Sequence, residues 1–110
     1  MNAEIENKLQ KLQLLEQQIQ NLSLQKQTFQ TQLSEVNSAL TALKGKKDAY
    51  KIIGNLMILC SSESIKLDLD SKFKMFNLQI KSLEKQEGRI NETAQKIQKE
   101  VMKSMGEGDE

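Results

Sequence analysis

The chain has 110 residues and a formal net charge of +1, with no proline, no histidine and one cysteine, Cys60. A chain of this length forms one domain at most, and its near-neutral charge gives no reason to expect binding to nucleic acid or to a membrane surface. Without histidine or a glycine-rich phosphate loop, we predict no catalytic residue, no metal site and no cofactor. No apolar stretch approaches the ~20 residues of a membrane span, and a lone cysteine fits a reducing compartment, so we expect a cytoplasmic protein.

The first segment, from Asn2 to Lys44, has the pattern of a long coiled-coil helix. Two series of residues repeat every seven positions along it, and all of them except Lys8 and Lys26 are apolar. A repeat sustained over this length predicts a coiled coil. Gly45 favours a helix end because glycine readily takes the left-handed conformation. The series are Ile5, Leu12, Ile19, Lys26, Leu33 and Leu40, and Lys8, Leu15, Leu22, Phe29, Val36 and Leu43.

The second segment, from Ser62 to Met105, repeats the same pattern, and here only Glu87 and Ser104 are polar. Either Ser61 or Ser62 can cap its start. Residues 106–110 are rich in glycine and acidic side chains, so we expect a disordered tail. The series are Leu69, Phe76, Leu83, Ile90, Ile97 and Ser104, and Phe73, Ile80, Glu87, Ala94 and Val101.

The polar positions in the two series predict how the helices pair. In an antiparallel arrangement whose opposite residue numbers add up to about 112 or 113, Lys26 faces Glu87 and Lys8 faces Ser104. Polar pairs of this kind fix the register of a coiled coil at some cost in stability. The alternative is that these side chains extend into water without pairing.

Residues 45–61, between the two segments, are predicted to form a β-hairpin. Apolar and β-branched residues flank Gly54-Asn55, a pair that suits a type II′ turn. The hairpin is apolar on both faces and has unpaired edges, and its own two helices cannot cover both faces. We therefore expect hairpins of several subunits to join into a shared sheet or barrel. The alternative is a compact cap that closes the helical pair without any partner.

The predicted fold is thus mainly α: a long antiparallel two-helix coiled coil joined by a central β-hairpin, forming one domain over residues 1–110. The stretch from Ala49 to Ile58, Ala-Tyr-Lys-Ile-Ile-Gly-Asn-Leu-Met-Ile, is similar to the hairpin of the prefoldin family. Leu83–Glu87 and Leu24–Gln27 also resemble that family, so the likeness covers nearly the whole chain. A single hairpin is typical of the β class, and the chain resembles the archaeal β-class subunits most.

This resemblance implies a function and partners. Prefoldins are ATP-independent co-chaperones built from two α-class and four β-class subunits, whose hairpins form a double β-barrel body. They hold unfolded proteins at the tips of their coiled coils and pass them to a group II chaperonin. For this sequence the resemblance implies assembly through Tyr50, Ile52, Ile53, Gly54, Asn55, Leu56 and Ile58, and client binding through Ile5, Leu9, Leu12, Ile97, Val101, Met102 and Met105.

The client-binding residues also have a purely structural interpretation. Leu9, Met102 and Met105 lie outside the heptad series, where flexible methionine side chains can offer an adaptable contact surface. The other four residues belong to the series and can equally complete the seam. The alternative function for the whole chain is a static coiled-coil scaffold or tether, which the central hairpin disfavours because tethers rarely need a β-forming head.

Overall fold

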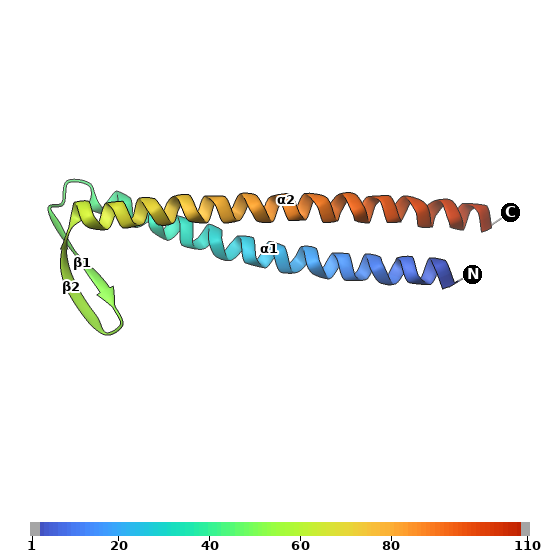
Figure 1. Ribbon diagram of the computed structural model, residues 1–110, viewed down its shortest axis with the longest axis horizontal. Helices are drawn as coiled ribbons and strands as arrows, with labels where there is room; N and C mark the ends of the chain where they lie inside the picture. The colour runs from blue at the N-terminus through green and yellow to red at the C-terminus, as the bar shows by residue number, and fades with distance from the viewer. Residues whose placement is uncertain (1–2, 109–110) are drawn as a thin grey trace. The chain divides into compact units, whose positions relative to one another are not determined.

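The computed structural model describes residues 3–108, and it contains two long helices with a β-hairpin between them (Figure 1). The elements are α1 (Ala3–Leu43), β1 (Asp48–Ile53), β2 (Leu56–Ser61) and α2 (Ser62–Gly108). The two strands pair antiparallel as a two-stranded sheet. The predicted fold class is therefore confirmed.

The chain divides into two compact units, which we describe separately. The terminal unit contains the described residues up to Lys26 together with those from Ser82 onward, and the hairpin unit contains Gln27–Lys81. Each unit holds a part of α1 and a part of α2. Both strands belong to the hairpin unit.

In the terminal unit, α1 and α2 pack antiparallel through the predicted seam. Ile5, Leu15, Ile97 and Val101 form a buried apolar cluster, against which Leu12, Ile90 and Ala94 pack. Burying each large apolar side chain favours folding by roughly 1.5–3 kcal/mol, which is the main stabilisation available to a helix pair with no other core. Ile5 and Val101 share this cluster, so the start of α1 and the last part of α2 lie at the same end of the unit.

The seam of the hairpin unit includes an aromatic pair. The rings of Phe29 and Phe76 lie 5.9 Å apart between centroids in a tilted arrangement, and Val36 and Ile80 are buried. Such ring pairs contribute about 0.5–1.5 kcal/mol beyond the area they bury. Across both units, every residue of the two predicted series is buried or half-buried, which confirms the heptad assignment.

The register prediction is confirmed at its central pair. Lys26 Nζ donates a hydrogen bond of 2.8 Å to Glu87 Oε1. This hydrogen bond raises the pKa of Lys26 above its ordinary value of 10.5, because the carboxylate favours the charged ammonium. The two side chains therefore pair across the seam and do not extend separately into water.

At the second polar position, Lys8 has two charged partners that the heptad pattern does not contain. Ser104 is half-buried, as expected for a seam residue, but Lys8 Nζ lies 3.5 Å from Glu100 Oε2 and 3.6 Å from Glu4 Oε1. Both carboxylates lie outside the heptad series. A lysine side chain is long enough to leave the seam and reach them while its methylene groups stay packed.

The ends of the helices differ slightly from the prediction. α1 ends at Leu43, one residue early, and Gly45 takes a left-handed φ of 75° after it. The predicted start at Asn2 lies outside the described residues. α2 begins at Ser62 with Ser61 as its cap, since Ser61 Oγ accepts a hydrogen bond of 3.2 Å from the Ser64 amide.

The expected disordered tail is wrong for residues 106–108, because α2 continues to Gly108. A glycine costs a helix only about 1 kcal/mol relative to alanine, and each added residue gains one backbone hydrogen bond on an existing helix. Asp109 and Glu110 lie outside the described residues.

Candidate functional site

The hairpin has two distinct faces, and its register determines which residues share each one. Gly54 has a φ of 59° and Asn55 does not have a positive φ, as a type II′ turn requires. Tyr50 pairs with Leu59 and Ile52 with Met57, and residues that pair directly project from the same face. We call the surface formed by these four side chains the outer face.

The outer face is an apolar surface that this chain does not cover. Its side chains are exposed to 63% for Tyr50, 71% for Ile52, 66% for Met57 and 60% for Leu59. Monomeric soluble proteins rarely expose a continuous apolar patch of this kind, and such patches commonly mark interaction sites. The outer face therefore has the chemistry of a protein interface.

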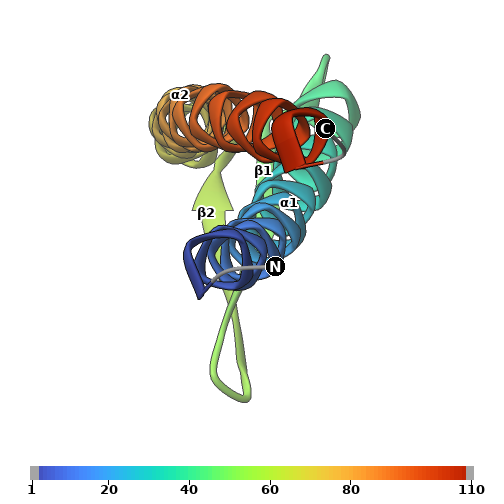
Figure 2. The ribbon, with the colours of Figure 1, turned by 90° about the vertical axis from the view of Figure 1, so that its right-hand side faces the viewer.

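The opposite face of the hairpin is turned toward α2, and we call it the helix-side face. It carries the pairs Lys51 with Ile58, Ile53 with Leu56 and Ala49 with Cys60. Lys51 Nζ lies 3.7 Å from Asp68 Oδ2 on α2, and Ala49 and Cys60 are half-buried. Figures 1 and 2 both show the hairpin extending away from the start of α2.

The predicted assembly residues are distributed over both faces and the turn. Tyr50 and Ile52 lie on the outer face, whereas Ile53, Leu56 and Ile58 lie on the helix-side face, and Gly54 and Asn55 form the turn. Met57 and Leu59 also lie on the outer face but were not among the predicted assembly residues. The strict alternation of faces along a strand, counted across from Tyr50 and Ile52, is the signal that could have identified them.

The predicted client-binding residues fall into two groups in the terminal unit. Ile5, Ile97 and Val101 are buried in the apolar cluster, and Leu12 is half-buried against it. The other three side chains are exposed: Leu9 to 43%, Met102 to 74% and Met105 to 54%. Only the exposed group offers its side chains to another molecule while the seam stays closed.

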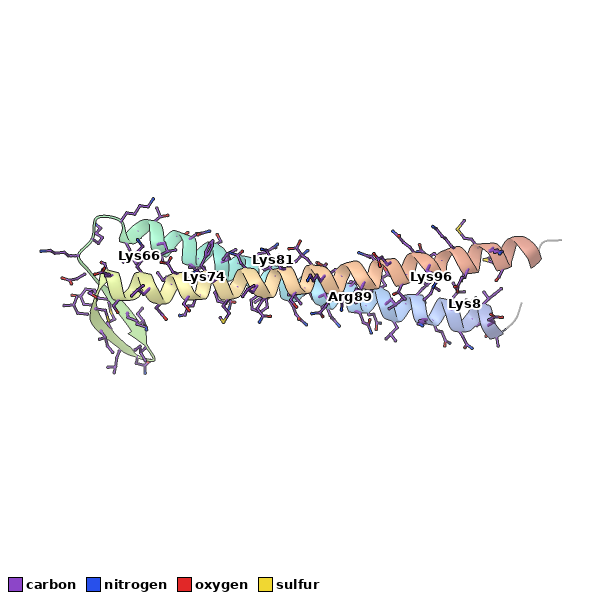
Figure 3. The ribbon with its side chains drawn as sticks, turned by 45° about the horizontal axis from the view of Figure 1, so that its top comes forward. Lys8, Lys66, Lys74, Lys81, Arg89 and Lys96 are labelled. Atoms are coloured by element: carbon purple, nitrogen blue, oxygen red, sulfur yellow. The ribbon has the colours of Figure 1, made fainter. Side chains whose placement is uncertain are left out.

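The outer surfaces of the helices carry charged side chains in water. Figure 3 shows Lys66, Lys74 and Lys81 along the part of α2 in the hairpin unit. Within the described part of the chain, no group of three or more His, Cys, Asp or Glu side chains could hold a metal ion. The described helices also contain no stretch that is long and apolar enough to cross a membrane.

Comparison with known proteins connects this architecture to a family. The family model described as prefoldin subunit matches residues 6–108, which include the hairpin, α2 and all but the first three residues of α1. The chain belongs to the prefoldin subunit family. Prefoldins are non-enzymatic chaperones, so the family supports a co-chaperone role for this chain.

The similar curated proteins place the chain in the β class of prefoldins. It is 31% identical over 101 residues to the prefoldin subunit beta of Sulfurisphaera tokodaii, covering 89% of this chain and 81% of that protein. It is 29% identical over 107 residues to the prefoldin subunit beta of Methanothrix thermoacetophila, covering 94% and 89%. The single hairpin agrees with this class.

A solved structure shows the same fold. The crystal structure of the prefoldin beta subunit from Thermococcus strain KS-1 matches with a TM-score of 0.88 and 24% sequence identity. The match covers 94% of this chain and 93% of that one. The arrangement of two helices around one hairpin is therefore a prefoldin fold.

Proposed function

We propose that this chain is the β-class subunit of a hetero-hexamer with two α-class and four β-class subunits. The complex binds unfolded proteins without ATP, prevents their aggregation and delivers them to a group II chaperonin. The observation that carries this proposal is the outer face of the hairpin, where four large apolar side chains are at least 60% exposed. A single chain has nothing to cover this surface, whereas a shared sheet of several hairpins would cover it.

Two features of the hairpin favour assembly. Apolar surface in water costs about 25 cal/mol per Å², so burying the outer face between subunits is strongly favourable. The two-stranded sheet also has one unpaired edge on β1 and one on β2, and their backbone amide and carbonyl groups can pair with strands of other subunits. When hairpins join edge to edge with their outer faces inward, the apolar side chains leave water and the strand edges become paired.

Native mass spectrometry of the chain, purified from its own cells, tests this assembly. We expect a complex that holds four copies of this chain and two copies of a longer coiled-coil subunit. The double variant Ile52→Lys/Met57→Lys, which places two charges on the outer face, should abolish the complex. A plain homodimer, or a complex with unrelated folded proteins, would instead support the scaffold function and contradict the proposal.

Client capture is assigned to the exposed apolar side chains of the terminal unit, Leu9, Met102 and Met105. Their exposure leaves them accessible while the buried cluster holds the helices together. Each contact is weak, but several subunits acting together on one unfolded chain raise the overall affinity by the effective concentration of the remaining sites. The buried residues Ile5, Ile97 and Val101 would contribute only when the helix ends separate.

The triple variant Leu9→Gln/Met102→Gln/Met105→Gln tests client capture. We expect it to assemble normally but to suppress the aggregation of a chemically unfolded protein several-fold less well, measured by light scattering without ATP. The matched control is Leu14→Gln/Leu24→Gln, which removes two leucines of similar exposure elsewhere on α1. If the triple variant suppresses aggregation as well as this control, clients do not bind at these residues.

A further inference from the structure

Large apolar side chains on the outer surface of α2 are restricted to its two ends. Leu67, Met75 and Leu78 are exposed near the hairpin, and Met102 and Met105 are exposed near the other end. Between residues 79 and 101, all of which the structure describes, every large apolar side chain is buried or half-buried. The exposed residues at the far end belong to the proposed client site. Those near the hairpin have no assigned role.

The three residues near the hairpin form one stripe. With 3.6 residues per turn, Leu67, Met75 and Leu78 lie within about 80° of one another around the helix, and the exposed polar residues Ser71 and Lys74 lie on the same side. Their side chains are 69%, 49% and 68% exposed. Asp68, which pairs with Lys51 of the hairpin, lies at the edge of this stripe. Lys51 of the chain's own hairpin therefore lies beside the stripe, but the hairpin does not bury the three side chains of the stripe.

The helix-side face of the hairpin leaves a matching apolar surface. Lys51 directs this face toward α2, yet Ile53 is 52% exposed, Leu56 65% and Ile58 41%. When hairpins join into a closed sheet, only one face of each strand can point to its interior. If the outer face fills that interior, the helix-side face needs a different apolar cover.

We propose that the helix-side face of one hairpin packs onto the stripe of a neighbouring copy of this chain. Ile53, Leu56 and Ile58 of the first copy would then contact Leu67, Met75 and Leu78 of the second. The stripe is continuous with the hairpin that forms the assembly surface, and each surface supplies the apolar cover that the other lacks. This inference rests on the proposed assembly and extends it from the hairpins to the helices.

Photo-cross-linking in the intact complex tests the contact directly. A benzoyl-phenylalanine at position 78 is introduced into 15N-labelled chains, which are assembled with unlabelled chains and the α-class partner. We expect cross-linked peptides that join the labelled stripe to unlabelled residues 48–61. Cross-links confined to one isotopic chain, or to the α-class partner alone, would overturn the proposal, because neither contact joins two copies of this chain.

A pair of matched variants measures the contribution of the contact. Leu67→Gln/Leu78→Gln should raise the concentration at which the complex half-dissociates by about tenfold or more, since two buried leucines are lost from each contact. Leu14→Gln/Leu24→Gln, which removes leucines of similar exposure on α1, should leave that concentration unchanged. Circular dichroism establishes that both variants remain helical.

The outcomes separate this inference from the assembly proposal. If the wild-type chain forms no hetero-oligomer, the proposed assembly itself is wrong. If the wild type assembles and the two double variants dissociate at the same concentration, assembly stands and the stripe has no part in it.

Discussion

Lys26 and Glu87 occupy seam positions that would otherwise hold apolar residues, and their hydrogen bond is the shortest charged contact recorded across the described part of the helix pair. A slip by one heptad would separate them and place each charge against apolar neighbours. The two charges stabilise each other in the native register, whereas in any other register each would be buried without a partner. The pair therefore contributes mainly to selecting the register.

A double-mutant cycle tests this role. We expect Lys26→Met and Glu87→Met each to lower the melting temperature, because each leaves an unpaired charge in the seam. The double variant should melt above both single variants, since no charge remains unpaired. Thermal melts followed by circular dichroism give the coupling between the two residues, and purely additive effects would show that they do not interact.

The raised pKa of Lys26 predicts a dependence of stability on pH. The hydrogen bond to Glu87 raises the pKa in the folded state above 10.5, which is close to the unfolded value. The stabilisation is therefore complete below that pH and is lost as the pH rises through the folded pKa. The difference in melting temperature between the wild type and Lys26→Gln should shrink above about pH 10.5, and a constant difference would contradict the assignment.

At the scale of elements, two glycines with different backbone conformations should respond oppositely to alanine. Gly88 lies within α2 with open space where a Cβ would be, so Gly88→Ala should stabilise the chain by about 1 kcal/mol. Gly54 has a φ of 59°, so Gly54→Ala should strain the turn by about 1–2 kcal/mol and weaken assembly. Urea denaturation measures the first effect and native mass spectrometry the second. A Gly54→Ala variant that assembles as fully as the wild type would refute the turn assignment.

The sequence predicts the helices and the hairpin well because each has a strong periodic signal. Every residue of the heptad series is buried or half-buried, and Gly54-Asn55 forms the predicted turn. The details that the sequence did not predict depend on side chains outside these patterns. Glu100 pairs with Lys8 from beyond the series, and the cap could be assigned to Ser61 only from its hydrogen bond to Ser64.

The candidate site was predictable only in part, because exposure is a property of the folded chain. The heptad series separates Ile5, which is buried in the seam, from Leu9, which lies outside the series and is exposed, but it does not show how exposed Leu9 is. The two faces of the hairpin likewise differ through a contact of the folded chain, the ion pair between Lys51 and Asp68 on α2. Composition and periodicity cannot report such contacts between distant residues.

For the whole molecule, the exposed apolar hairpin predicts that stability depends on assembly. A partner that binds only the folded chain stabilises it by mass action, so the melting temperature should rise when the α-class subunit is added and should increase with total concentration. Differential scanning calorimetry over a hundredfold range of concentration measures this effect. A melting temperature that is the same with and without the partner would show that folding and assembly are independent.

The shared cluster of Ile5 and Val101 has a consequence for how the chain is made. These residues come from opposite ends of the sequence, so α1 leaves the ribosome long before the part of α2 that covers its seam. Synthesis proceeds at about 5–20 residues per second, which leaves the apolar series of α1 unpaired for several seconds. The hairpin, whose contacts are local, can form first and align the helices, and the seam then closes from the hairpin toward the termini. A member of a chaperone family thus passes through a nascent state in which its own apolar series is exposed.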